Sequence, residues 1–166
     1  MTATTRLGLS LVVLSFAATA FGCSDPADVA GDYTVALTNR ENGCNFDSWT
    51  VGNTSNNIPV TITQEGSSMS ATVGGGAAVV LDLALGAHVY QGDVDGSHLS
   101  ATLYGNRSAT NGNCTFTYNS TFDADADGDF LTGEIRYTPA TNGNPDCATI
   151  EGCVNRQEFN GSRPPQ

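Results

Sequence analysis

The chain contains no lysine, and it has few positive charges of any kind. All six cationic residues are arginines, against 17 aspartates and glutamates, so the 166 residues carry a formal net charge of −11. A negative field of this size repels phosphate backbones and anionic lipid headgroups. The composition therefore argues against nucleic acid as a partner, and it leaves protein partners undefined.

The sequence also lacks the motifs that mark common catalytic sites. It has two histidines but no Gly-x-Ser-x-Gly or His-Glu-x-x-His motif, and the glycines at 74–76 are not followed by the Lys-Ser/Thr of a phosphate-binding loop. We expect His88 to be a hydrogen-bonded structural side chain and His98 to lie exposed opposite Asp93. We therefore expect no enzymatic activity. Carboxylates that meet from distant strands are the arrangement that the sequence leaves open.

No apolar run reaches the ~20 residues that a transmembrane helix requires. A shorter run lies near the N-terminus, at residues 7–16 (LGLSLVVLSF). Arg6 precedes this run, and small residues follow it up to Gly22. A charged start, an apolar core and a small-residue end are typical of a secretory signal peptide. We assign residues 1–22 to this signal.

The end of this signal, Ala20-Phe21-Gly22-Cys23, resembles the lipobox of bacterial lipoproteins. The resemblance implies that Cys23 is acylated after cleavage before it and that the protein is anchored to a membrane by its lipid. Ser24 follows the cysteine, which implies the outer membrane of the bacterial cell envelope, although Asp25 comes next. The departures from the family pattern are Ala20 in place of the common leucine and the bulky Phe21. The alternative is an ordinary signal with a chance cysteine.

Assigning Cys23 to the lipid leaves four cysteines, which are Cys44, Cys114, Cys147 and Cys153. An even number in an oxidising compartment predicts two disulfides. Three pairings are possible, and we favour Cys44–Cys114 with Cys147–Cys153, because a short local bridge pins a loose segment. The absence of a CxxC pair argues against a zinc site.

Most of the remaining chain alternates apolar and polar residues with period two, as β-strands do. Tyr33, Val35 and Leu37 alternate with polar neighbours, and the same pattern recurs at residues 114–122 and 131–137. Asp95-Gly96 is a strong hairpin-turn signal. The run at 77–85 is apolar enough for a buried strand or a short helix, and the sequence does not decide between them.

These patterns predict an all-β fold of about eight antiparallel strands joined in chain order. Such sheets hide their edges by closing into a barrel or by pairing as a sandwich. We favour an up-and-down barrel, with a β-sandwich as the alternative. We expect a short tether at residues 23–30, a single β domain at 31–161 and a loose tail at 162–166. Gly31-Asp32-Tyr33 resembles the Gly-x-Trp opening of lipocalin and avidin-like barrels, but no ligand-binding residue carries over.

One acidic segment, residues 123–134, matches the D-x-D-x-D-G-x₅-E pattern of an EF-hand calcium loop. Its candidate ligands are Asp123, Asp125, Asp127, Asp129 and Glu134. Carboxylates at alternate positions of a loop can converge on one calcium ion, and the glutamate can close the shell. Strands rather than helices are expected on both sides, so the alternative is a solvated hairpin turn. Calcium is the cofactor that the sequence leaves open.

The fold expectation suggests a membrane-tethered binding module with a small apolar or amphipathic ligand in the barrel. The alternative is a surface interaction or structural protein whose barrel is filled by side chains. A pocket of several hundred cubic ångströms favours the first hypothesis. We expect such a pocket to be lined by Tyr33, Tyr90, Phe116 and Tyr118.

Overall fold

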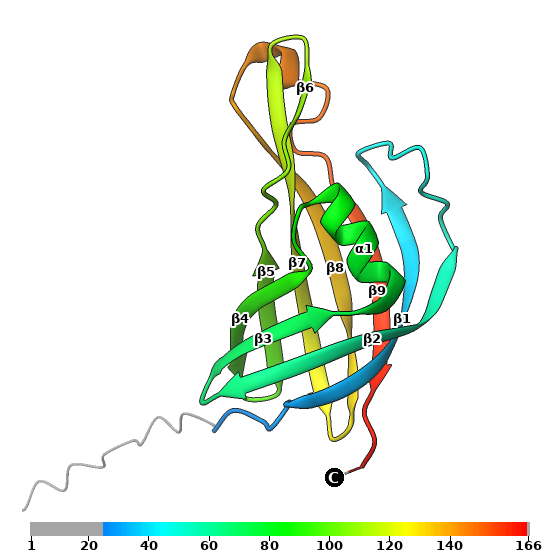
Figure 1. Cartoon of the computed structure of the whole chain (residues 1–166), viewed down its shortest axis with the longest axis vertical. Helices are drawn as coiled ribbons and strands as arrows, with labels where there is room; N and C mark the ends of the chain where they lie inside the picture. Colours follow the sequence, from blue (N-terminus) through cyan, green and yellow to red (C-terminus); the bar gives the residue numbers. More distant parts are fainter. Residues whose placement is uncertain (1–24, 166) are drawn as a thin grey trace, which may run out of the picture.

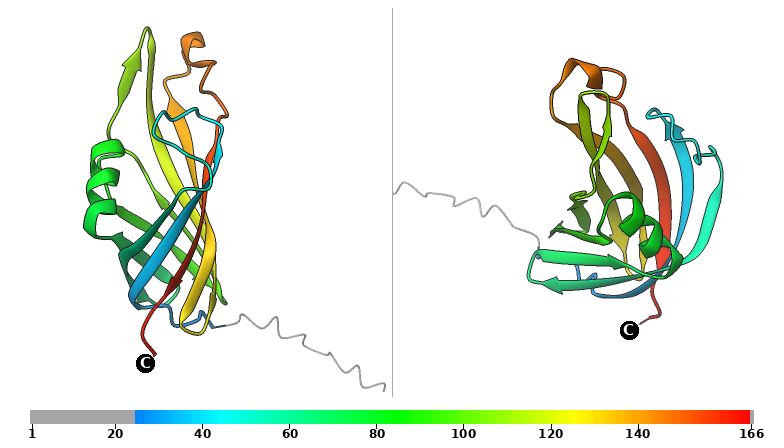
Figure 2. Two further views of the ribbon diagram at one scale, coloured as in Figure 1. Left: turned by 90° about the vertical axis from the view of Figure 1, so that its right-hand side faces the viewer. Right: turned by 45° about the horizontal axis from the view of Figure 1, so that its top comes forward.

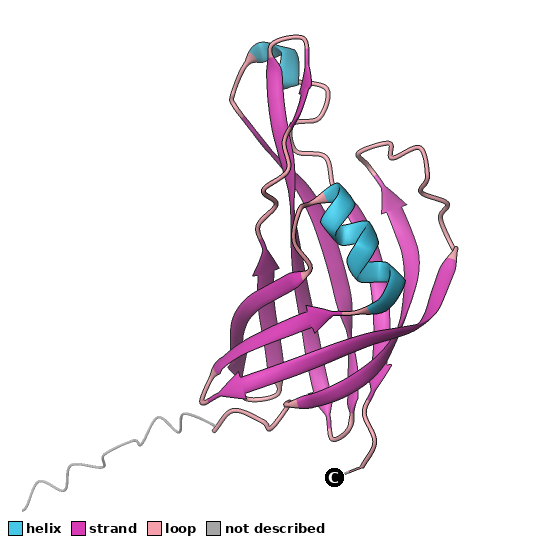
Figure 3. Cartoon of the chain, in the orientation of Figure 1, coloured by secondary structure: helices cyan, strands magenta, loops and turns pink. Residues whose placement is uncertain are grey.

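The computed structural model describes residues 25–165. This part of the chain contains nine β-strands, one α-helix and one 3₁₀ turn (Figure 3). Their bounds are β1 Gly31–Asn42, β2 Thr54–Glu65, β3 Ser68–Val73, α1 Gly75–Ala84, β4 Val89–Asp95, β5 His98–Leu103, β6 Ala109–Asn111, β7 Cys114–Asp127, β8 Phe130–Thr141, η1 Pro145–Cys147 and β9 Asn155–Ser162.

The strands form one antiparallel sheet that closes on itself. Its order is β5-β4-β3-β2-β1-β9-β8-β7-β6, and β5 also pairs with β7. Within residues 25–165, β6 pairs only with β7 and lies beyond the closed ring (Figures 1 and 2). The fold is therefore an all-β closed barrel of eight antiparallel strands with one extra strand. This confirms the up-and-down barrel prediction and rules out the sandwich.

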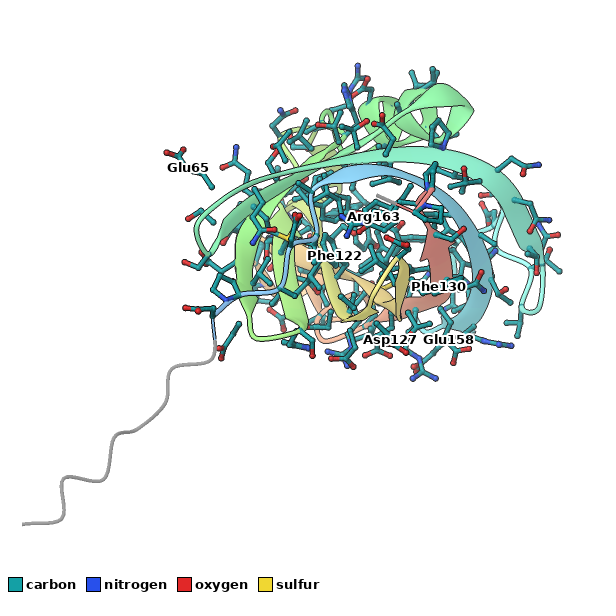
Figure 4. The ribbon with its side chains drawn as sticks, turned by 90° about the horizontal axis from the view of Figure 1, so that it is seen from below. Glu65, Phe122, Asp127, Phe130, Glu158 and Arg163 are labelled. Carbon is teal, nitrogen blue, oxygen red and sulfur yellow. A yellow bond between two sulfur atoms is a disulfide. The ribbon has the colours of Figure 1, made fainter. Side chains whose placement is uncertain are left out.

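The period-two pattern decides which side chains enter the barrel. Along β4, Tyr90 and Val94 are buried while Gln91 and Asp93 are exposed. Viewed along the barrel axis, the strands form a ring with Phe122 inside it and Glu65 outside it (Figure 4). The apolar side chains that become buried in this way are Val29, Tyr33, Val35, Ile58, Ile62, Met69, Ala71, Leu85, Tyr90, Val94, Leu99, Ala101, Leu103, Phe122, Ala124 and Leu131.

The β4–β5 hairpin differs in register from our expectation. Asp95 pairs with His98, so the two turn residues are Gly96 and Ser97 rather than Asp95 and Gly96. Gly96 has a φ of 59°, which only glycine adopts at little cost. The shift places Asp93 opposite Ser100 instead of His98. The predicted inward set survives, because Val94 now lies opposite Leu99.

The apolar run that the sequence left undecided forms helix α1. It connects β3 to β4 and crosses the upper end of the barrel, where β1 ends and β2 begins (Figure 1). Ala77 and Leu81 pack against the barrel core, whereas Val79, Val80 and Leu83 are exposed. Apart from Asp82 the helix is apolar, yet it lies on the surface, which explains why periodicity could not identify it.

Two disulfides are present, and the pairing that we favoured is wrong. Cys44 is joined to Cys153, and Cys114 is joined to Cys147. Closure of the barrel places the first strand beside the last, with Asn42 of β1 opposite Asn155 of β9. Cys44 and Cys153 lie just beyond these paired residues, so a bridge across 109 residues becomes local in space.

The lower end of the barrel is closed by segments that we expected to be loose. Val29, expected in the tether, has an exposed fraction of 0%, and its carbonyl accepts a hydrogen bond from the Tyr33 hydroxyl. Arg163, expected in the tail, forms an ion pair with Asp129 and donates to the backbone carbonyl of Ala30. Residues 27–30 and 163 therefore belong to the folded domain.

Candidate functional site

A cavity of about 510 Å³ lies in the barrel lumen. Side chains of β1, β2, β3, β4, β7, β8 and β9 line it, and the first turns of α1 cover it. Its apolar wall consists of Val35, Leu37, Ile58, Pro59, Val60, Ile62, Ala71, Val73, Ala77, Val80, Leu81, Phe122, Leu131, Ile135 and Phe159. A volume of this size falls within the range of small-molecule sites.

Side chains fill part of the lower end of the same barrel. Met69, Val94, Leu99 and Ala124 are buried there, and none of them lines the cavity. Val29 is also buried at this end, so these residues form a floor. The cavity is therefore a feature of this sequence rather than a consequence of barrel closure.

The rim of the cavity is polar. Ser55, Asn56 and Asn57 of β2 line it at the upper end, facing the glycines at 74–76 that precede and begin α1. Asn57 has a φ of 59°, and the pairing of β1 with β2 shifts register between Val35 and Leu37. The irregular pairing here marks the edge of the opening, because β-bulges bend a strand and interrupt its ladder.

Three hydroxyl groups lie together on the wall of the lumen. The Tyr90 hydroxyl is 2.7 Å from the Ser120 Oγ, and the Tyr137 hydroxyl donates to the Gln157 Oε1 at 3.0 Å. Gln157 in turn donates from its Nε2 to the Asn39 Oδ1 at 2.7 Å. Tyr90, Tyr137 and Gln157 all line the cavity, so this network presents polar atoms to an otherwise apolar space.

Burial keeps both phenols of this network protonated. It raises the pKa of Tyr90 to about 12, and the hydrogen bond with Ser120 opposes the rise. Burial also raises the pKa of Tyr137 well above its usual value of 10, and the charge that Tyr90 would carry raises it further. Both side chains are thus neutral hydrogen-bonding groups at physiological pH.

Of the four aromatic residues that we expected around a pocket, two line it. Tyr33 and Tyr90 face the cavity, whereas Phe116 and Tyr118 do not. Tyr118 instead packs edge-on against Phe46 of the β1–β2 loop, with ring centroids 4.9 Å apart. Trp49 of the same loop packs edge-on against Tyr137 at 6.0 Å. The loop therefore adds an aromatic cluster that packs against β7 and β8, which the sequence pattern did not indicate.

The acidic segment does not form the calcium loop that we considered. β7 continues to Asp127, so Asp123, Asp125 and Asp127 lie on an extended strand, and the turn consists of Gly128 and Asp129 alone. An extended strand does not wrap its carboxylates around one ion as the coiled loop of an EF-hand does. Within residues 25–165, no group of three or more potential ligands lies close enough to hold a metal.

The acidic side chains of this segment contact histidine and arginine side chains instead. Asp123 and Asp125 lie beside His98, at 3.8 and 3.1 Å. Glu134 contacts Arg136 and Arg156, and Asp129 binds Arg163 at 3.0 Å. The other histidine, His88, contacts Asp82 of α1 at 2.8 Å. The His98 and His88 pairs are partly exposed, whereas Arg163 is only 8% exposed.

The candidate lipidation site, Cys23, lies outside the described residues. None of the helices formed by residues 25–165 has the length and apolarity needed to cross a membrane.

No family model and no curated protein matches the chain. Among solved structures, it is similar to EF1p2_mFAP2b bound to DFHBI. The sequence identity is 11%, the TM-score is 0.39, and the similarity covers 81% of this chain and 93% of that chain. The barrel architecture itself follows from the strand pairings of this chain.

Proposed function

We propose that this chain is a lipid-anchored extracytoplasmic protein that binds a small apolar or amphipathic ligand inside its barrel. The observation that carries the proposal is the apolar cavity of about 510 Å³ above a packed floor. The cavity wall supplies no carboxylate, histidine or thiol from the described residues, which favours binding over catalysis. The polar rim suits a ligand that keeps one polar end near the opening.

The expected affinity follows from the apolar area that a ligand can bury. A ligand that loses about 300 Å² of apolar surface gains about 7 kcal/mol, at about 25 cal/mol per Å². Immobilising the ligand offsets part of this gain. We therefore expect dissociation constants between about 10 µM and 1 mM for simple apolar probes.

The proposed anchor sits at the end of the barrel opposite the opening. Ala27 donates its backbone N–H to the carbonyl of Gly96 in the β4–β5 turn, at the lower end (Figure 1). Three residues, 24–26, separate Ala27 from the proposed acylation site at Cys23, and the four Cα–Cα steps span at most about 14 Å. The cavity then opens away from the membrane, so a ligand enters from the aqueous side. Intact-mass measurement of protein extracted from the envelope tests the acylation: a chain that begins elsewhere contradicts it.

A surface-interaction role is the second candidate, and the outer face of α1 favours it. Val79 and Leu83 are both more than half exposed and lie about one turn apart on this short helix. Exposed apolar patches of this kind can mark interaction sites. A hydrophobic probe could bind this face instead of the lumen, so the test must separate the two locations.

Titration with the uncharged fluorophore N-phenyl-1-naphthylamine makes this separation. Val60→Trp places a large side chain in the lumen, and Thr63→Trp places the same group on the exposed face of the same strand. We expect saturable fluorescence with the wild type and Thr63→Trp, and loss of most of it with Val60→Trp. Thermal unfolding confirms that both variants fold.

A third variant, Leu83→Ser, removes an apolar side chain from the outer face of α1. We expect it to bind the probe as the wild type does. Binding that survives Val60→Trp but is lost in Leu83→Ser would assign the probe to the outer face and overturn the proposal.

A further inference from the structure

We propose that the cavity selects uncharged ligands that carry a hydrogen-bonding oxygen and rejects carboxylates of the same shape. This inference rests on the proposed function and defines the ligand class for the same cavity. It follows from two features of the wall, which are the absence of charge and the presence of the hydroxyl network.

Charged side chains are kept off the inner face of the barrel throughout the described strands. The inward positions of β1 are Tyr33, Val35, Leu37 and Asn39, and the only polar inward positions of β9 are Asn155 and Gln157. Every charged strand residue lies on the outer face, as Glu65, Asp127 and Glu158 do in Figure 4. The cavity therefore has no counter-charge to offer an ionised ligand from residues 25–165.

Arg163 lies against a side chain of the cavity wall, and Asp129 neutralises its charge. Its guanidinium carbon lies 5.7 Å from the centroid of the Tyr33 ring. Its nitrogens bond to the Asp129 carboxylate at 3.0 Å and to the carbonyls of Ala30 and Asp28. Arg163 thus holds the lower end of the barrel closed, and it does not pair with an anion in the lumen.

An ionised ligand without a partner is strongly disfavoured in such a space. Removing a carboxylate from water without a compensating charge is costly, so the group remains outside or becomes protonated. The mature chain adds repulsion, since five arginines against 17 acids give a net charge of −12. Both effects act against anions, whereas neither acts against a neutral alcohol, ester or amide.

The hydroxyl network provides the polar contact for such a neutral group. The Tyr90, Ser120 and Tyr137 hydroxyls interact with one another, and Tyr137 also donates to Gln157. Each hydroxyl oxygen has two lone pairs, so the network keeps acceptor positions for a ligand hydroxyl or amide N–H. Since Tyr90 and Tyr137 both face the cavity, a ligand oxygen can reach the network from an apolar approach.

The test compares 1-decanol with decanoate as competitors of N-phenyl-1-naphthylamine. At pH 7.5 we expect decanol to displace the probe with at least tenfold higher affinity than decanoate. At pH 4 decanoic acid is largely protonated, so we expect the difference to shrink to threefold or less while the affinity for decanol stays constant. Equal affinity of decanol and decanoate at pH 7.5 would overturn the inference, as would tighter binding of decylammonium than of decanol.

The failure of this inference differs from the failure of the proposed function. If no compound displaces the probe and the probe itself does not bind, the lumen is not a binding site. If all compounds bind equally, the lumen binds ligands but does not select by charge.

Tyr137→Phe separates the contribution of the hydroxyl network from that of the apolar wall. We expect it to weaken decanol binding by about 3–10-fold, with a smaller effect on the probe. The exposed Tyr104→Phe serves as the matched control, and equal effects of the two variants on decanol contradict the role of the network.

Discussion

The Tyr90 hydroxyl lies 2.7 Å from the Ser120 Oγ inside a barrel whose other inward side chains are mostly apolar. The ring of Tyr90 packs edge-on against Phe122, with centroids 5.4 Å apart. The side chain therefore belongs to the core through its ring and to the cavity through its hydroxyl. Because Tyr90 contributes to both the core and the cavity, its substitution should change the stability of the protein as well as ligand binding.

The stability of the protein should fall as the pH rises from about 10 to about 12. Tyrosines of the unfolded chain ionise near pH 10, whereas Tyr90 in the folded state keeps its proton up to a pKa of about 12. The unfolded state therefore binds fewer protons in this window, and the free energy of unfolding decreases with a slope of up to about 1.4 kcal/mol per pH unit for this group. Urea unfolding at several pH values measures the slope. Tyr90→Phe should make the slope shallower, and an unchanged slope contradicts this assignment.

The disulfide that links the first and last strands should contribute more stability than the other. In the chain-entropy account the stabilisation grows with loop length. The Cys44–Cys153 bridge spans 109 residues and the Cys114–Cys147 bridge spans 33. We expect the double variant Cys44→Ser/Cys153→Ser to lose about 5 kcal/mol and Cys114→Ser/Cys147→Ser about 4 kcal/mol. Peptide mapping under non-reducing conditions checks the pairing itself, and a peptide that links Cys147 to Cys153 would contradict it.

Arg163 should stabilise the lower end of the barrel although it lies in the C-terminal tail. Its side chain is only 8% exposed and binds Asp129 and two backbone carbonyls. Arg163→Ala leaves these acceptors without their donor, which typically costs about 2–4 kcal/mol for a largely buried pair. Arg107→Ala, at an exposed position, is the control. Chemical unfolding compares them, and a loss below about 0.5 kcal/mol at Arg163 would show that the tail is dispensable.

Calcium should neither bind to the acidic hairpin nor stabilise the protein. Asp123, Asp125 and Asp127 lie along a strand, and Glu134 is already engaged by Arg136 and Arg156. Calorimetry at millimolar calcium should record no binding heat, and the melting temperature should not change. A saturable heat that disappears in Asp125→Ala/Asp127→Ala would restore the calcium hypothesis.

The fold could be predicted from the sequence because alternation is a local property. Alternation identifies the inner face of a strand without reference to any other strand, as it does at Tyr90 and Val94 in β4 and at Leu131 and Ile135 in β8. The predicted β4–β5 partners were wrong by two residues, and a shift by an even number leaves that face unchanged. Neighbouring strands follow one another along the chain, and Gly96 lies in one of the short turns that join them.

The disulfide pairing and the acidic hairpin could not be predicted in the same way. Cys44 and Cys153 meet only because the barrel closes, which no local pattern records. The spacing of the acidic residues along the sequence matches a calcium loop, but Asp123 and Asp125 lie on an extended strand of the folded protein.

The cavity could not be predicted from the sequence either, because a hollow barrel and a packed one use the same apolar residue types. Phe46 of the β1–β2 loop packs against Trp49 and Tyr118, and Tyr118 does not line the cavity. Tyr137, whose inward position the alternation did predict, becomes important only because it meets Gln157 of the last strand. Contacts between strands distant in sequence therefore define the site.

The most direct test of the binding proposal is a crystal structure of the protein with N-phenyl-1-naphthylamine. The proposal predicts electron density for the aromatic rings of the probe inside the lumen, in contact with Phe122 and Ile135 and below α1. A lumen filled by its own side chains, with the probe absent or bound only to the outer face of α1 near Leu83, would contradict it.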